Sequence, residues 1–218
     1  MFRHSANTNQ TLHDDSHYAG LPIQRSKGPF VLEYLNRLQV TVERALAEHP
    51  RVFAFRIDLR FPSGRLEPSW VEGNGVIGRF VASFRAKVEH NRKRARELRR
   101  YSHDSSVRYV WAREVGERSR PHYHVAFMLN GNAFCTLGKY EMGRDNLFNR
   151  LQEAWASALD LSVEGVEGLV EVPKNACYRL RRDDGASVED FFYRASYLCK
   201  VATKRFGDGT HGFGASRC

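Results

Sequence analysis

The sequence predicts an α+β domain in which helices cover a central antiparallel sheet. Residues 51–61 alternate apolar and polar side chains, the pattern of a strand with one buried face. Two further strand segments, residues 107–114 and 121–130, are joined by a turn short enough for a hairpin. Apolar residues at helical spacing precede, separate and follow these strands, which favours helices packed on the sheet.

The chain begins with a polar segment. Residues 1–27 are rich in His, Asn and Asp, and we expect a disordered tail. A chain of 218 residues is long enough for one substantial core, so residues 28–218 are expected to form a single domain. Its first helix is predicted to begin after Gly28-Pro29, because proline is favoured in a first helical turn, and to end near His49-Pro50.

The strand at residues 51–61 has one apolar and one polar face. The apolar face belongs in the core and carries Phe53, Phe55, Ile57, Leu59 and Phe61. The other face carries Ala54 and the charged residues Arg56, Asp58 and Arg60. Charges in the middle of so strong a strand indicate that this face meets water or a ligand.

A long helix is predicted at residues 76–100. Its second half, residues 85–100, carries eight basic residues against Glu89 and Glu97, typical of a solvated helix face or of a phosphate-binding surface. The preceding Gly73-Asn74-Gly75-Val76-Ile77-Gly78 has the spacing of a dinucleotide-binding turn. The segment before it is short and contains Pro68, so the strand that such a turn requires is missing and no nucleotide cofactor is expected.

The second half of the chain also alternates predicted helices and strands. After the hairpin we predict a helix at residues 144–159, a strand at 166–172, a polar loop at 173–187 and a helix at 188–204. A glycine-rich segment ends the chain. No internal repeat is present.

Composition narrows the class of protein. Lys and Arg outnumber Asp and Glu by 34 to 25, a net charge of +9, which favours a polyanionic partner such as nucleic acid. Neither a signal peptide nor an apolar run of about 20 residues is present, so we expect a cytoplasmic protein without membrane contact. Scattered cysteines (Cys135, Cys177, Cys199 and Cys218) are expected to be free thiols.

A metal site is predicted on the hairpin. His122 and His124 project from one face of their strand, because alternate strand residues share a face. If the turn is symmetric about Arg118, Glu114 lies opposite His122 with Cβ atoms about 5 Å apart. Two imidazoles and a carboxylate leave coordination positions open on a divalent ion, so Mg²⁺ or Mn²⁺ is expected, with Zn²⁺ also compatible. The alternative is a histidine that merely satisfies a core position.

The last predicted helix carries a polar stripe. Tyr193, Tyr197, Lys200 and Lys204 fall within about 60° of one another at 100° per residue. By itself the stripe is typical of a solvent face. Beside a metal site, a lysine that favours the phenolate turns a tyrosine into a nucleophile. The apolar back of this helix then needs cover from another element, and the helix near residues 30–48 is the candidate.

Motif order and local words resemble the HUH endonucleases. The resemblance is strongest to the inovirus-type (filamentous phage gene II-like) replication initiators, including prophage proteins of the YagK/YfjJ C-terminal domain type. Residues 55–62, 111–124, 193–200 and 213–216 carry it, and it covers about residues 30–218. Tyr123 stands where the family name suggests a bulky aliphatic residue, although an aromatic side chain suits that core-facing position.

The resemblance implies an HUH/RRM-like fold, a variant of the ferredoxin-like arrangement, and a metal-dependent single-stranded DNA nickase and strand transferase. It implies that Tyr197 is the main nucleophile and Tyr193 a second one, aided by Lys200, with metal on His122, His124 and Glu114. The residues expected to contact DNA are Arg56, Asp58, Arg60 and Lys204. Expected partners are a single-stranded or hairpin origin and the host helicase and polymerase.

Three alternatives remain open at this point. A non-catalytic, repressor-like prophage protein would bind DNA without metal. A metal hydrolase that activates water would leave no covalent adduct. A mobile-element transposase would use the same tyrosine chemistry on another DNA substrate.

Overall fold

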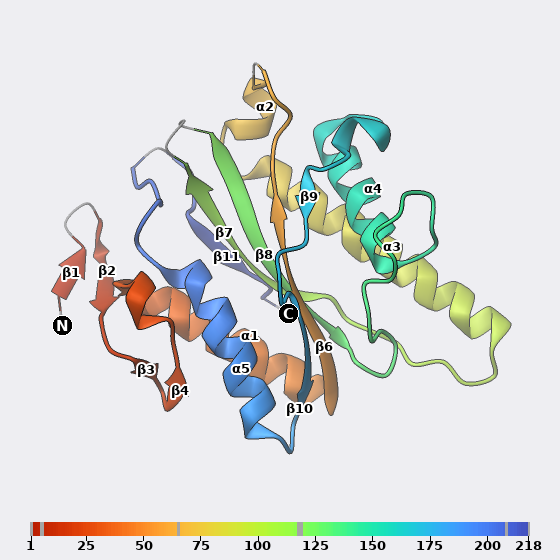
Figure 1. Cartoon of the computed structure of the whole chain (residues 1–218), viewed down its shortest axis with the longest axis horizontal. Helices are drawn as coiled ribbons and strands as arrows, with labels where there is room; N and C mark the ends of the chain where they lie inside the picture. The colour runs from red at the N-terminus through yellow and green to blue at the C-terminus, as the bar shows by residue number, and fades with distance from the viewer. Residues whose placement is uncertain (1, 5–6, 65, 117–119, 208, 218) are drawn as a thin grey trace.

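The computed structural model describes residues 2–4, 7–64, 66–116, 120–207 and 209–217. Its centre is an antiparallel six-stranded sheet (Figure 1). The strand order is β10-β6-β8-β7-β11, and β9 also pairs with β6. The strands are β6 (Arg51–Leu59), β7 (Arg108–Val115), β8 (Pro121–Asn130), β9 (Val170–Glu171), β10 (Cys177–Arg181) and β11 (Phe213–Ala215). The predicted α+β class is confirmed.

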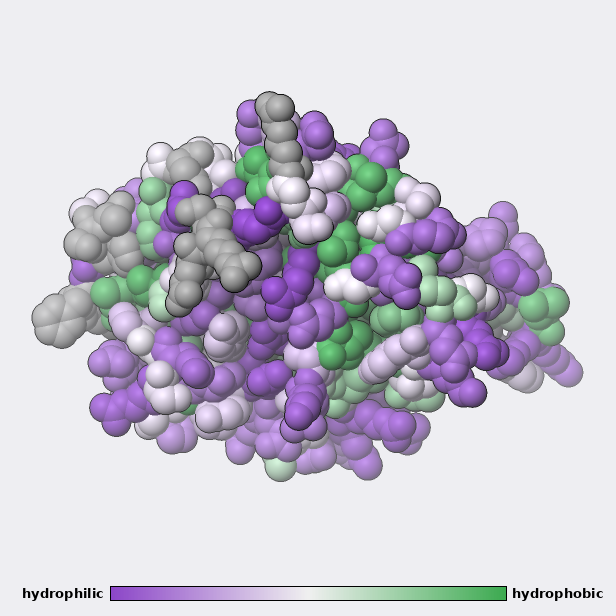
Figure 2. Space-filling view, turned by 45° about the horizontal axis from the view of Figure 1, so that its top comes forward, coloured by the Kyte–Doolittle hydropathy of each residue, from purple (hydrophilic) through white to green (hydrophobic). Residues whose placement is uncertain are grey.

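Helices cover both faces of the sheet. On one face lie α3 (Gly75–Leu98) and α4 (Leu147–Leu159), with the short α2 (Pro68–Val71) beside them. On the other lie α1 (Leu32–Glu48) and α5 (Gly185–Ser196). Figure 2 shows that hydrophilic residues cover most of the outer surface on one side of the molecule. In the described part of the chain, no helix is long and apolar enough to cross a membrane.

The core under α3 and α4 is aromatic. The Phe127 ring, which is fully buried, lies 4.7 Å from that of Phe84 and 5.5 Å from that of Phe55, measured between centroids. Phe80 packs edge-on against Trp155, at a centroid distance of 5.7 Å. These rings come from β6, β8, α3 and α4, so the alternation of large side chains in both strands holds this layer to the sheet.

The second face of the sheet corrects the prediction for β6. We expected this face to meet water or a ligand, but Ala54, Ala126 and Met128 are buried beneath α1 and α5. Small and flexible apolar side chains let a second helical layer approach the strands closely. The charged residues Arg56 and Asp58 lie on the same face toward the end of β6 and are also buried.

The hairpin register agrees with the prediction. Glu114 pairs with His122, and Ala112 pairs with His124. Tyr123 and Val125, between and after the two histidines, point into the aromatic core. The tip of the turn, residues 117–119, lies outside the described residues.

The N-terminal segment is ordered where we expected a disordered tail. Four strands and a 3₁₀ turn precede α1: β1 (Phe2–His4), β2 (Asn7–His13), β3 (His17–Tyr18), β4 (Leu21–Pro22) and η1 (Arg25–Lys27). A further strand, β5 (Phe30–Val31), pairs with β2, and α1 begins only at Leu32. Ile23 is buried in the core under α1 and α5, and the backbone N–H of Gln24 donates to Ser196 Oγ at 3.1 Å. These contacts hold a segment whose polar composition suggested disorder.

The C-terminal helix is shorter than predicted. It spans Gly185–Ser196, and the chain then forms a 3₁₀ turn, η3 (Tyr197–Cys199). Two contacts end it: Ser196 Oγ donates back to the Tyr193 carbonyl at 2.7 Å, and the Val201 N–H donates to the Pro29 carbonyl at 2.9 Å. The predicted loop at residues 173–187 contains β10, an edge strand, and the predicted strand at 166–172 is reduced to β9 and a 3₁₀ turn, η2 (Glu164–Val166).

Candidate metal centre

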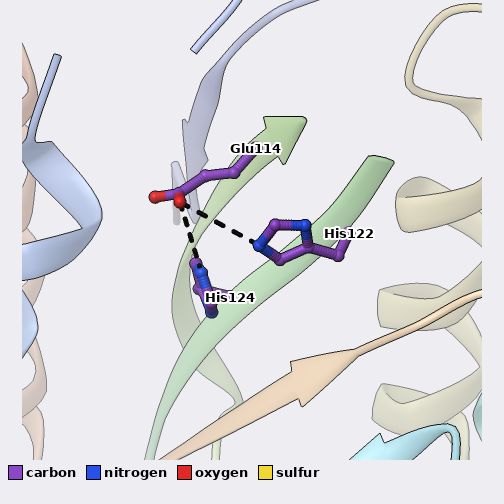
Figure 3. A group of neighbouring side chains, drawn as sticks. All are labelled: Glu114, His122 and His124. Atoms are coloured by element: carbon purple, nitrogen blue, oxygen red, sulfur yellow. Dashed lines mark ion pairs between the residues drawn. The ribbon is translucent and has the colours of Figure 1, made fainter. Parts of the chain in front are cut away.

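Three side chains with metal-binding chemistry converge at one end of the hairpin. Glu114 comes from β7, and His122 and His124 from β8 (Figure 3). Ligand atoms of the three lie within 4.8 Å of one another. Glu114 Oε2 lies 3.5 Å from His124 Nε2 and 4.0 Å from His122 Nε2. The structure thus brings together the three residues that the hairpin register predicted.

The donor set fits a divalent cation. His124 Nε2 and Glu114 Oε1 are buried and have no hydrogen-bond partner among the described residues. Such atoms lose free energy unless something pairs with them. Burial and the nearby His124 lower the pKa of His122, which favours the neutral imidazole that a metal requires. Mixed nitrogen and oxygen donors without thiolate suit Mg²⁺, Mn²⁺ or Zn²⁺.

Asp58 orients His124 from behind. Its Oδ1 lies 2.6 Å from His124 Nδ1, so a proton on Nδ1 leaves Nε2 free to face Glu114. Arg56 binds Asp58 Oδ1 at 3.1 Å and holds the carboxylate in place. Burial alone would raise the pKa of Asp58, but the hydrogen bond to His124 and the charge of Arg56 hold it below the usual range. Arg56 and Asp58, both predicted to contact DNA, are buried.

Tyr197 lies against the same cluster. Its ring centroid is 5.4 Å from that of His124, and Lys200 donates a hydrogen bond to its phenol oxygen. Lys200 Nζ lies 3.8 Å and Arg56 Cζ 4.8 Å from the centroid of the phenol ring. Residues three apart in a 3₁₀ turn eclipse each other, which explains why Lys200 stacks over Tyr197. Two cations therefore stand beside the phenol.

Glu114 is the electrostatic centre of the site. Lys200 Nζ lies 3.0 Å from its Oε2, Lys204 Nζ lies 3.7 Å from its Oε1, and Thr203 Oγ1 donates to Oε2 at 2.6 Å. Although burial raises it, the adjacent His124 ring and the charge of Lys204 hold the pKa of Glu114 far below its usual range. Burial lowers the pKa of Lys204 to about 8, against the opposing effect of Glu114. The cations Arg56, Lys200 and Lys204 surround the carboxylates Asp58 and Glu114, and this excess of positive charge suits a phosphate group beside the triad.

The other residues predicted for the site are Tyr193, Arg60 and Lys204. The Tyr193 side chain is 47% exposed on α5, one turn before Tyr197. Arg60 forms an exposed ion pair with Glu171 at 2.9 Å. Lys204, predicted to contact DNA, is buried and pairs with Glu114. Thr203 was missed, because nothing in the sequence distinguishes it: it reaches Glu114 through a positive φ of 69° after η3.

Two curated relatives and one solved structure are similar to this chain. The N-terminal nuclease domain of non-structural protein 1 of minute virus of mice matches 82% of this chain and 77% of that domain, with 10% identity and a TM-score of 0.25.

The sequence relatives are far more similar. The uncharacterized protein YfjJ of Escherichia coli (strain K12) is 32% identical over 200 residues, 87% of this chain and 96% of the relative. The uncharacterized protein YagK of the same strain is 32% identical over 208 residues, 89% of this chain and 97% of the relative. The model of the YagK/YfjJ C-terminal domain matches residues 13–216. This chain therefore belongs to the YagK/YfjJ C-terminal domain family.

Proposed function

We propose that this chain is a metal-dependent, site-specific nickase and strand transferase that acts on single-stranded or hairpin DNA. In this proposal it starts rolling-circle replication of a phage, prophage or plasmid. The observation that supports it most is the position of Tyr197: its phenol lies between Lys200 and His124, beside three side chains suited to a divalent cation. A solvated tyrosine on a helix face would have none of these neighbours.

Tyr197 acts as the nucleophile. Its phenol oxygen forms a bond to the scissile phosphorus while the bond from phosphorus to the 3′-oxygen breaks, which gives a 5′-phosphotyrosine and a free 3′-hydroxyl. The phenol loses one proton and the 3′-oxygen gains one, so the step is balanced. Attack by a 3′-hydroxyl on the phosphotyrosine is the reverse reaction and rejoins the strand. The freed 3′-hydroxyl serves as the primer for the host polymerase, with a host helicase opening the duplex.

The side chains around Tyr197 prepare this step. Lys200 donates to the phenol oxygen and stabilises negative charge that develops there. Asp58 and Arg56 fix the His124 ring, so that its Nε2 faces Glu114. A divalent cation bound by Glu114, His122 and His124 would supply charge withdrawal from a phosphate oxygen. Tyr193 is proposed as a second nucleophile, available for a further transfer because its side chain is exposed.

A covalent-adduct assay tests the proposal. The protein is incubated with Mn²⁺ and a single-stranded DNA library labelled at the 3′ end, because the 3′ fragment is the one that stays attached to tyrosine. Labelled protein on a denaturing gel is expected for wild type and for Tyr193→Phe, and is expected to disappear with EDTA or in Tyr197→Phe. An adduct that persists in Tyr197→Phe would rule out Tyr197, and cleavage without any adduct would indicate a water-using hydrolase.

One observation favours a second candidate, a non-catalytic DNA-binding protein. Lys200 and Lys204 already neutralise Glu114, as a metal ion would. If these ammonium groups replace the cation, DNA binding would be salt-sensitive, independent of divalent ions and unaffected by His122→Ala. Calorimetric titration with Mn²⁺ separates the nickase from the non-catalytic DNA-binding protein. Heat of Mn²⁺ binding that is present in wild type and lost in His122→Ala supports the nickase.

A further inference from the structure

We propose that the outer end of α3 is a docking surface for the phosphate backbone of duplex DNA, separate from the metal centre. We call residues 92–101 the α3 tip. The identification of the polyanion as DNA rests on the proposed function. The charge and the placement of the surface are independent of that function.

The α3 tip concentrates positive charge that the fold leaves largely unneutralised. It has one carboxylate, Glu97, and six cationic side chains: Arg92, Lys93, Arg94, Arg96, Arg99 and Arg100. Arg94 pairs with Asp145 at 4.0 Å, and Arg96 pairs with Asp104. Within the described part of the chain, Lys93, Arg99 and Arg100 have no ion-pair partner, and all three are exposed. A helix face that is merely solvated is usually balanced by acidic neighbours.

The fold presents this charge away from the rest of the molecule. In Figure 1, α3 runs past the sheet and past α4 and ends at the right-hand edge. Figure 2 shows that this end is mostly hydrophilic. Because α3 packs on the face opposite α1 and α5, the tip and the metal centre lie on opposite faces of the sheet. A duplex bound at the tip would therefore occupy a different surface from the single strand at Tyr197.

The shape of the tip suits a row of phosphates. From Arg92 to Leu98, where α3 ends, the helix rises about 9 Å at about 1.5 Å per residue, roughly the rise of three phosphates along one strand, and Arg99 and Arg100 follow directly. A groove beside the tip is lined by Arg92, Arg94, Arg99 and Tyr101. Tyr101 is 81% exposed and Arg100 Cζ lies 5.5 Å from the centroid of its ring. Guanidinium forks bind phosphate oxygens in pairs, which favours a phosphate backbone over isolated carboxylates.

The crowding of guanidinium groups supports this reading. Burial lowers the pKa of Arg92 and the positive charge of Arg150 lowers it further, whereas Asp104 opposes them; Arg99 and Arg96 have smaller lowering effects. Cations this close to one another gain free energy when an anion binds between them. Elsewhere in the described chain, basic side chains such as Arg60 and Arg181 lie beside carboxylates.

Duplex binding in EDTA tests the docking surface without any cleavage. Fluorescence anisotropy is measured with a labelled duplex for wild type and for the triple variant K93Q/R99Q/R100Q. The matched control R37Q/K174Q/R179Q removes the same charge from exposed residues elsewhere. The tip variant is expected to weaken binding by about tenfold or more and to lower the salt slope by about 0.9 per lost contact, while the control changes affinity by less than about twofold.

Equal weakening of duplex binding by both triple variants, or no weakening by the tip variant, would overturn the proposed docking surface. Far-UV circular dichroism checks that both variants fold, and the single variant R99Q repeats the test with the least perturbation. Adduct formation on short single strands with Mn²⁺ is expected to be unchanged in K93Q/R99Q/R100Q. If wild type forms no adduct but the tip variant still loses duplex binding, the proposed nickase fails and the docking surface stands.

Discussion

Replacing Glu114 with Gln is expected to destabilise the metal-free protein strongly. The Glu114 side chain is 2% exposed, and Lys200 and Lys204 lie 3.0 and 3.7 Å from its two oxygens. Gln keeps the shape but removes the charge, so two buried ammonium groups lose their counter-ion. Breaking a buried pair in this way costs about 3–5 kcal/mol. Because Lys204, with a pKa of about 8, discharges readily, we expect a value near the lower limit, about 3 kcal/mol.

Urea denaturation in EDTA, followed by circular dichroism, measures this free energy of unfolding. The matched control is Glu171→Gln on the same sheet, whose carboxylate pairs with Arg60 at 2.9 Å but whose side chain is 49% exposed. We expect the control to cost less than about 1 kcal/mol. The double variant E114Q/K204M is expected to lose less unfolding free energy than Glu114→Gln and Lys204→Met lose in sum. We expect the difference to be about 1 kcal/mol or more.

A cost for Glu114→Gln no greater than that for Glu171→Gln would contradict the buried pairing of Glu114 with the two lysines. Additive changes at Glu114 and Lys204 would contradict it too, because additivity would mean that the two charges do not interact. Equal m-values in all variants are needed, since a changed m-value would indicate a changed unfolded state rather than a lost pair.

Three further predictions test other parts of the structure. Asp58→Asn is expected to weaken Mn²⁺ binding by about 10–100-fold in calorimetry, because Asp58 orients His124, and an unchanged affinity would count against that role. Phe127→Ala is expected to cost about 3–5 kcal/mol in urea unfolding, because Phe127 is fully buried. Leu98→Ala, at a residue that is 76% exposed, should change stability by less than about 0.5 kcal/mol. Similar costs for the two variants would contradict the packing of Phe127 in the core. Burial lowers the pKa of His49 below 6.5, so the unfolded state binds more protons between the two pKa values and stability falls as pH drops through that window. His49→Gln should reduce this slope between about pH 5 and 7, and an unchanged slope would assign it to other groups.

The grouping of the three candidate metal-binding residues was predictable because two strand rules fix it. Alternation places His122 and His124 on one face, and a symmetric turn places Glu114 opposite His122. Both rules depend only on local spacing. The aromatic core followed from the same alternation in β6 and β8.

The surroundings of the ligands were not predictable from local pattern. Helical periodicity continued through Tyr197 and Lys200, but the helix ends at Ser196 because the distant Gln24 and Pro29 hold the chain there. Tyr197, Lys200 and Lys204 do meet near Glu114, by a 3₁₀ turn and an extended segment rather than by one helical stripe. The buried positions of Arg56 and Asp58 depend on the second helical layer, which the pattern of β6 alone did not reveal.

The polar N-terminal segment shows the same limit. Composition suggested disorder, but Ile23 is buried in the core, Tyr18 and Leu21 pack against it, and backbone pairing with β5 orders β2. Long-range contacts of this kind leave no periodic signal.

Peptide mapping of a DNA-linked protein tests the central idea most directly. Trypsin cleaves after Arg194 and Lys200, so Tyr197 lies in the peptide of residues 195–200 and Tyr193 in the preceding one. After reaction with single-stranded DNA and Mn²⁺ and digestion with nuclease, mass spectrometry should find the nucleotide mass on residues 195–200. Nucleotide only on the peptide that ends at Arg194, or cleaved DNA with both tyrosine peptides unmodified, would contradict the assignment of Tyr197 as the nucleophile.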